Sequence, residues 1–110
     1  MKRVLLSAVV ALFGACDVTD WDVAISRYGA AVCVGSMTLD DVGSKVTGTW
    51  ECEPFGGAVS GTIRADGHTL IDFETRTGAF NRMRGTAADD KIVGEIRIDH
   101  DLLPFSAVRR

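Results

Sequence analysis

The chain has little of what marks helical or nucleic-acid-binding proteins. It contains only two prolines, two histidines and one tyrosine, and no helical repeat of apolar residues follows its first 16 residues. Its formal net charge is −3, so it lacks the basic excess that binds nucleic acid. The 110 residues suffice for one domain, which we expect to be a monomer. Twelve glycines predict many turns and glycines within strands.

Catalytic and metal-binding patterns are also missing from the sequence. The serines do not lie in a nucleophile elbow, and Glu51 and Glu53 share the outward face of a predicted strand, as solvated carboxylates do. His68 and His100 lie in predicted turns. Two aspartates flank His100, but adjacent turn residues rarely converge on one ion. We therefore expect no enzyme activity, no cofactor and no metal.

The first 16 residues, MKRVLLSAVVALFGAC, have the pattern of an export signal. Lys2 and Arg3 supply positive charge, and the apolar stretch Val4–Phe13 is too short to cross a bilayer of about 30 Å as a helix. Two small residues then precede Cys16. This pattern predicts a signal peptide over residues 1–15. An N-terminal helix buried in the domain is the alternative.

The end of this leader resembles the lipobox of bacterial lipoproteins, in which the cysteine after the cleavage site is lipidated. Cys16 matches that cysteine, whereas Phe13 stands where the pattern usually has Leu. The resemblance implies a membrane anchor through Cys16 and a short tether over residues 16–20, in the periplasm or on the cell surface. Asp17 resembles the signal that retains such proteins at the inner membrane. Cleavage without lipid, which would leave a free thiol, is the alternative.

The stretch Val32–Ile63 predicts three consecutive antiparallel strands. Apolar and polar residues alternate from Val46 to Cys52, which is typical of a half-buried strand. With a turn at Asp40–Ser44, this strand pairs with the preceding one so that Cys33 lies directly opposite Cys52. Opposed residues have the Cα separation that a disulfide requires, and export supplies an oxidising compartment. The predicted partners are Leu39 with Val46, Met37 with Gly48, Gly35 with Trp50, and Cys33 with Cys52.

Further short alternating stretches, separated by turns, continue to the end of the chain. They predict an all-β domain over residues 21–110: about eight antiparallel strands in an up-and-down meander that closes into a barrel. This domain resembles small glycine-rich β-barrel lipoproteins of the lipocalin-like or streptavidin-like type. The resemblance is architectural and assigns no ligand residues.

Large side chains at inward positions predict a filled barrel with at most a small cavity. The residues expected in this core or against a ligand are Trp21, Met37, Trp50, Phe73 and Phe105. Trp50 is expected between Gly35 and Gly61, and Gly61 opposite Phe73. Pro104 cannot donate to a strand ladder, so we expect the last strand to be ragged or the barrel to be open beside it.

Arg82, Arg84 and Arg97 are predicted to point outward from two neighbouring strands. If the glycines of these strands pair, Arg84 faces Glu95 and Arg82 faces Arg97, and like charges opposite each other are unfavourable. The arginines form either a docking patch for an acidic partner or lipid headgroups, or an ordinary solvated face.

Two classes of function are compatible with these features. The first is a non-enzymatic envelope lipoprotein that binds a small apolar ligand or an envelope protein, or has a structural role. The second is a periplasmic inhibitor of a secreted hydrolase, either a lysozyme or a protease. An interior cavity would favour the first class. A protruding loop at Glu53–Ala58 with an exposed Phe55 would favour the second.

Overall fold

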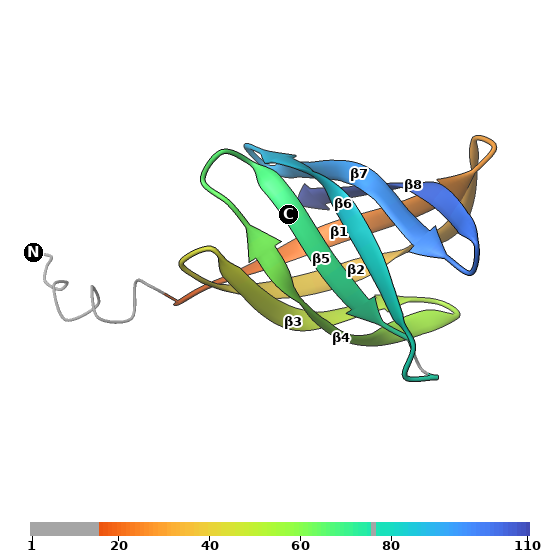
Figure 1. The fold of residues 1–110 in the computed structure, drawn as a ribbon, viewed down its shortest axis with the longest axis horizontal. Helices are drawn as coiled ribbons and strands as arrows, with labels where there is room; N and C mark the ends of the chain where they lie inside the picture. The colour runs from red at the N-terminus through yellow and green to blue at the C-terminus, as the bar shows by residue number, and fades with distance from the viewer. Residues whose placement is uncertain (1–15, 76) are drawn as a thin grey trace, which may run out of the picture.

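In the computed structural model, residues 16–75 and 77–110 are described, and they form eight antiparallel strands (Figure 1). The strands are β1 (Cys16–Arg27), β2 (Ala30–Val42), β3 (Lys45–Cys52), β4 (Phe55–Ile63), β5 (His68–Glu74), β6 (Phe80–Ala88), β7 (Lys91–Ile98) and β8 (Asp101–Arg109). The predicted signal peptide, residues 1–15, lies outside the described residues.

Each strand pairs with the next along the chain, and β1 pairs with β8, so the sheet closes into a barrel. The predicted all-β meander is confirmed, and pairing of the first strand with the last closes the sheet into a barrel, which is how such folds reduce exposed sheet edges. The turns alternate between two ends. We use "far end" for the one that carries the β1–β2, β3–β4, β5–β6 and β7–β8 turns, which is the end away from Cys16 (Figure 1).

The barrel begins earlier than predicted. The expected tether, residues 16–20, is the first part of β1 and pairs with residues 38–42 of β2. The polar composition of this segment is typical of a loop, but β2 continues through Asp40 and Asp41 and supplies a partner for each residue. The described part of the barrel therefore includes residues 16–20, which were expected to form a tether.

The turn between β2 and β3 is shorter than predicted, so their register differs by two residues. Only Gly43 and Ser44 lie between the strands, and the φ of Gly43 is +64°, as two-residue hairpins favour. The observed partners are Val42 with Lys45, Leu39 with Gly48, and Met37 with Trp50. Because side chains alternate with a period of two, an even shift leaves each of them on the predicted face.

The next two registers also differ from prediction by an even number of residues. The β3–β4 turn has two residues rather than five, so Trp50 lies opposite Gly57 and not opposite Gly61. Phe73 of β5 lies opposite Val59. The β6–β7 register, with its two glycines opposite each other, is confirmed.

The interior is filled by apolar side chains. Among the described residues, nineteen apolar residues are buried, including all five that the sequence places inside: Trp21, Met37, Trp50, Phe73 and Phe105. The rings of Trp50 and Phe73 meet edge to face with centroids 4.8 Å apart, and Phe105 lies 5.3 Å from Phe73. An eight-stranded barrel is narrow enough for its own side chains to fill it in this way.

The predicted Cys33–Cys52 disulfide is present, although the two cysteines do not lie directly opposite each other. The β2–β3 ladder ends at Ser36 and Glu51, and Cys52 then packs on the backbone of Gly35. Cys33 is the next inward residue of β2. The bridge therefore joins diagonal neighbours, whose Cα atoms are 5.5 Å apart, within the normal range for a disulfide.

The prediction for Pro104 holds on one side of β8 only: the sheet closes into a barrel, but the β1–β8 ladder ends at Phe105, the residue after Pro104. Pro104 pairs with Glu95 of β7, and β8 continues in both directions. The β1–β8 ladder extends from Trp21 only to Ile25, which pairs with Phe105. Pro104 lies just beyond that ladder, where its missing N–H removes no bond to β1.

Candidate functional site

Three arginines of β6 and β7 line one hollow on the outside of the barrel near its far end. The hollow has a volume of about 300 Å³ and is lined by Arg82, Arg84, Glu95, Arg97 and Leu102. Alternation along β6 puts Arg82 and Arg84 on the same face. We refer to these five residues as the arginine hollow. The predicted patch is thus a concave surface.

Asp72 of β5 holds Arg82 in place. The two residues are direct strand partners, and Arg82 donates from Nε to Oδ1 at 2.8 Å and from Nη2 to Oδ2 at 3.1 Å. These bonds hold the pKa of the Asp72 carboxyl below its ordinary value of 3.8 and raise the pKa of Arg82. The β6–β7 ladder ends at Met83 and Ile96, and its register continued by one position places Arg82 opposite Arg97, as predicted; both arginines line the hollow.

Arg84 and Arg97 form no hydrogen bond or ion pair with other described residues. Arg84 lies opposite Glu95, as predicted, but the two charged groups are not in contact. Three guanidinium groups of the region therefore face two carboxylates, those of Asp72 and Glu95. This leaves one net positive charge and two guanidinium groups free to bind an anion.

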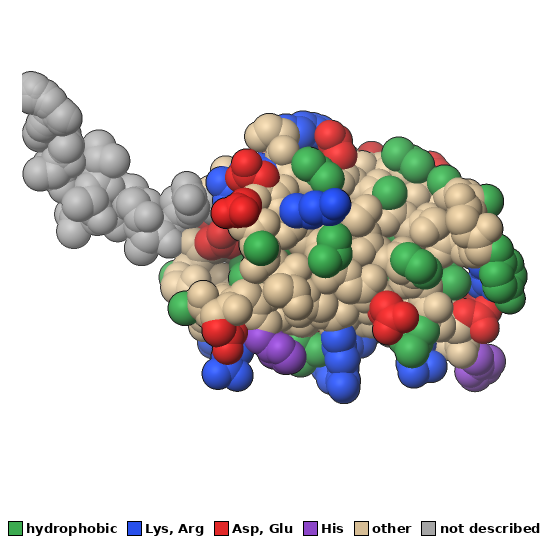
Figure 2. All heavy atoms as spheres, turned by 90° about the horizontal axis from the view of Figure 1, so that it is seen from above, with side chains coloured by type: hydrophobic (Ala, Val, Ile, Leu, Met, Phe, Trp, Pro, Cys, Tyr) green, Lys and Arg blue, Asp and Glu red, His purple; other side chains and the backbone are tan. Residues whose placement is uncertain are grey.

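Exposed apolar side chains border the same region. Leu102 is 51% exposed and lies opposite Arg97 in the β7–β8 ladder, and Phe80 is 63% exposed at the outward position of β6 before Arg82. The sequence interpretation missed both residues, although strand alternation could have found Phe80. Seen from above, charged and apolar side chains are interspersed over the outside of the barrel (Figure 2). Such a mixture is ordinary for a protein surface, so the hollow rather than the composition distinguishes this region.

A second hollow, of about 670 Å³, lies where β4 and β5 separate. The β4–β5 ladder extends only to Val59 and Phe73. Beyond that point, Nε1 of Trp50 donates to the Glu74 carbonyl at 2.9 Å, beside Gly57, whose φ is +151°. The indole thus replaces missing ladder bonds, and this part of the hollow serves to close the barrel wall.

Phe55 does not lie on a protruding loop. It is the first residue of β4, half-buried, and its ring stacks on Trp50 with centroids 6.1 Å apart and planes at 6°. It borders a hollow of about 350 Å³ at the far end, together with Pro54 and Ile98. The protruding loop that would have favoured an inhibitor is therefore not found here, because the turn before β4 has only two residues.

The tip of the β1–β2 hairpin does protrude from the barrel (Figure 1). Tyr28 at this tip is 97% exposed and has a φ of +52°, which is unusual for a bulky residue. Arg27 fixes the tip to the β7–β8 turn, because its Nη1 donates to Oδ2 of Asp101 at 2.7 Å. One exposed ion pair thus links the base of the tip to the start of β8.

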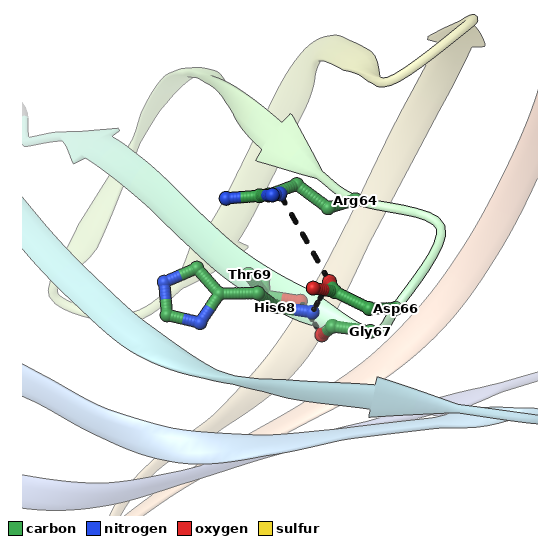
Figure 3. Close-up of polar contacts among 5 residues, drawn as sticks. All are labelled: Arg64, Asp66, Gly67, His68 and Thr69. Atoms are coloured by element: carbon green, nitrogen blue, oxygen red, sulfur yellow. Dashed lines mark hydrogen bonds and ion pairs between the residues drawn. The ribbon is translucent and has the colours of Figure 1, made fainter.

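The two histidines lie in exposed positions near turns. In the β4–β5 turn, Oδ1 of Asp66 accepts a hydrogen bond from the backbone N–H of His68 at 3.0 Å (Figure 3). Nε of Arg64 lies 4.0 Å from the same Oδ1 atom. The His68 bond holds the pKa of Asp66 below its ordinary value. The imidazole points away from these groups. Within residues 16–75 and 77–110, no three His, Cys, Asp or Glu residues are placed to hold a metal ion.

Comparisons with protein-family models, with curated proteins and with solved structures find no match to this chain. The described part of the chain has no helix of the length and apolar character that a membrane span needs. Function must therefore be inferred from the residues of the barrel itself.

Proposed function

We propose that this protein is an exported, membrane-anchored lipoprotein of the cell envelope that binds its partner on the outside of the barrel and has no catalytic role. The observation that carries the binding role is the arginine hollow, in which Arg84 and Arg97 have no hydrogen-bond or ion-pair partner among residues 16–75 and 77–110. The interior supports the same conclusion, because it is occupied by apolar side chains of the barrel.

The anchor is supported by the lipobox-like sequence that ends at Cys16. Because β1 begins at this residue, a lipid on Cys16 would attach directly to the N-terminal end of the barrel. The far end, with the arginine hollow, would then face away from the anchoring membrane. Retention at the inner membrane through Asp17 stays a prediction.

A small apolar ligand would find its place at the far end rather than in the core. The hollow beside Phe55 has apolar lining residues, among them Phe55, Pro54 and Ile98, together with polar ones such as Asn81. Its volume of about 350 Å³ is at the small end of the range for ligand sites.

Two measurements test this function. Labelled palmitate should be incorporated into the wild type and not into Cys16→Ser. Wild type captured from envelope extract should bring down a partner that the variant Arg84→Gln/Arg97→Gln does not. If the wild type incorporates no labelled palmitate, the lipid anchor is wrong. If the wild type and the double variant capture the same partner equally, binding through Arg84 and Arg97 is wrong.

Inhibition of a secreted hydrolase is the second candidate. The observation that favours it is the protruding tip with Tyr28, which is 97% exposed and is therefore accessible to the site of an enzyme. Tyr28→Ala should then abolish inhibition of a lysozyme or an envelope protease while the thermal midpoint stays unchanged. Absence of inhibition by the wild type across both enzyme classes excludes this candidate.

A further inference from the structure

We infer that the arginine hollow binds a singly charged oxyanion, a carboxylate or a phosphodiester, that carries an apolar substituent. This inference rests on the proposed function in one respect, namely that the outside of the barrel is the binding surface. It adds the chemical class of the ligand.

The cations of the hollow are arranged for oxyanion binding. A guanidinium group offers parallel N–H donors that match the two oxygens of a carboxylate or a phosphodiester. Arg82 already makes this contact with Asp72, at 2.8 and 3.1 Å. Arg84 and Arg97 line the same hollow with no such partner. An incoming anion can therefore bind to them without breaking an internal ion pair.

The charge of the hollow favours a single negative charge on the ligand. Arg82 is neutralised by Asp72, and Glu95 lies among the lining residues together with Arg84 and Arg97. One net positive charge remains. A dianion such as a phosphate monoester would exceed it and would be repelled by Glu95, because like charges within a few ångströms raise each other's energy.

The borders of the hollow favour an apolar substituent on that anion. Leu102, which is 51% exposed, lines the hollow. Phe80, which is 63% exposed, precedes Arg82 in β6 and lies nearer the far end. Covering such side chains with an alkyl or aliphatic group removes apolar area from water. A volume of about 300 Å³ admits the anionic group and a short substituent, not a large ligand.

The position of the hollow indicates where the ligand comes from. Arg82 and Arg97 lie near the far end, whereas Cys16 begins β1 at the opposite end. β1 has 12 residues, which corresponds to about 40 Å along the strand. With a lipid on Cys16, the hollow faces away from the anchoring leaflet. Its ligand is then a soluble molecule or belongs to a structure that faces that membrane.

Titration calorimetry with four soluble probes tests the inference on protein purified from the envelope. The probes are hexanoate and dibutyl phosphate, which carry alkyl chains, and acetate and dimethyl phosphate, which carry none beyond a methyl group. We expect saturable binding of the first two, each about tenfold tighter than its short counterpart. Stronger binding of hexanoate indicates a carboxylate ligand, and stronger binding of dibutyl phosphate indicates a phosphodiester. Tighter binding of the dianion butyl phosphate overturns the single-charge requirement.

Variants locate the binding. Arg84→Gln and Arg97→Gln should each weaken binding about tenfold or more, and Arg84→Lys less, because Lys keeps the charge but not the paired donors. Leu102→Ser should abolish the advantage of the alkyl chain. Arg64→Gln is the matched control: this arginine is exposed on the β4–β5 turn at the opposite end and should leave affinity unchanged.

The inference fails if both glutamine variants, with wild-type thermal midpoints, bind the probes as the wild type does, or if wild-type binding does not saturate. This failure is distinguishable from failure of the proposed function. If the wild type incorporates palmitate but binds none of the anions, the inferred ligand class is wrong, and the lipid anchor is unaffected. Anion binding without palmitate incorporation removes the anchor and leaves the hollow as a binding site.

Discussion

The β2–β4 wall of the barrel and the β5–β7 wall use their side chains in different ways. The first contains the Cys33–Cys52 bridge and the stacked rings of Trp50 and Phe55, and its outward residues include many threonines and serines. The second has the arginines on its outward face and two of them unpaired. Both walls contribute buried core residues, but only the first has a disulfide, and only the second has the arginine hollow. We therefore predict that substitutions in the two walls change different measurements.

The largest loss of stability should follow Trp50→Ala. Trp50 is 3% exposed, contacts Phe55 and Phe73, and holds β5 through its bond to Glu74. Truncation of a buried aromatic side chain typically costs about 3–5 kcal/mol, and this one also breaks a hydrogen bond across the gap between β4 and β5. Urea unfolding monitored by circular dichroism measures the change.

Tyr28→Ala is the control for that prediction, because it removes an aromatic side chain that is 97% exposed. Its free energy of unfolding should stay within about 0.5 kcal/mol of wild type. Equal losses for the two variants would show that the β2–β4 wall has no special share in stability.

Loss of the disulfide should have the next largest effect. The bridge joins residues 19 apart, and the loop-entropy model gives about 3 kcal/mol for a loop of this size. Cys33→Ser/Cys52→Ser should lower the free energy of unfolding by roughly that amount. Peptide mapping without reduction checks the pairing itself: free thiols at both positions, or a link from Cys16 to either, would contradict it.

The disulfide also shows what the sequence could and could not predict. The inward faces of all eight strands follow from alternation, and every expected core residue is buried. The registers of β2–β3 and β3–β4 were wrong by two and four residues, because Asp40, Asp41 and Gly56 are typical turn residues that here continue their strands. Cys33 and Cys52 still form the disulfide, because an even shift in register keeps both side chains on the inward face of the sheet. A diagonal pair of residues is close enough to be bridged.

The candidate site was predictable only in part, for a related reason. The tight Asp89-Asp90 turn fixed the β6–β7 register, so the pairing of Arg84 with Glu95 was predicted correctly. Asp72 was not expected as the partner of Arg82, because that contact depends on the register of β5 with β6. Leu102 enters the hollow through pairing of β7 with β8, which no local pattern encodes.

A smaller effect is expected from Gly94→Ala in the β5–β7 wall. Gly94 lies opposite Gly85, and a Cβ on Gly94 would lie 2.6 Å from the Gly85 Cα. The strands must move apart, at a cost of about 1–3 kcal/mol. Thr86→Ala on the outward face is the control and should change stability little. A Gly94→Ala protein as stable as the control would show that β6 and β7 are not held this closely.

The smallest effect on stability should come from Asp72→Asn, which tests whether the charges of the β5–β7 wall contribute to folding. Arg82 holds the pKa of Asp72 below 3.8 in the folded state. The ion pair therefore contributes above the unfolded pKa of the carboxyl, and the contribution is lost as the pH falls through the lower folded value. Because the Arg82 side chain is 52% exposed, we expect less than about 1 kcal/mol.

Wild type should accordingly be more stable than Asp72→Asn at pH 7. This difference in stability should disappear as the pH falls below 3.8. Thermal unfolding of both proteins from pH 7 to pH 2.5 measures it. Asp90→Asn is the matched control, because Asp90 forms a longer, 3.9 Å ion pair with Arg109 and is more exposed. A gap that persists unchanged at pH 2.5 would show that Asp72 acts through packing rather than charge. At neutral pH, the loss of Asp72 also frees Arg82, so anion binding at the hollow should strengthen while stability falls slightly.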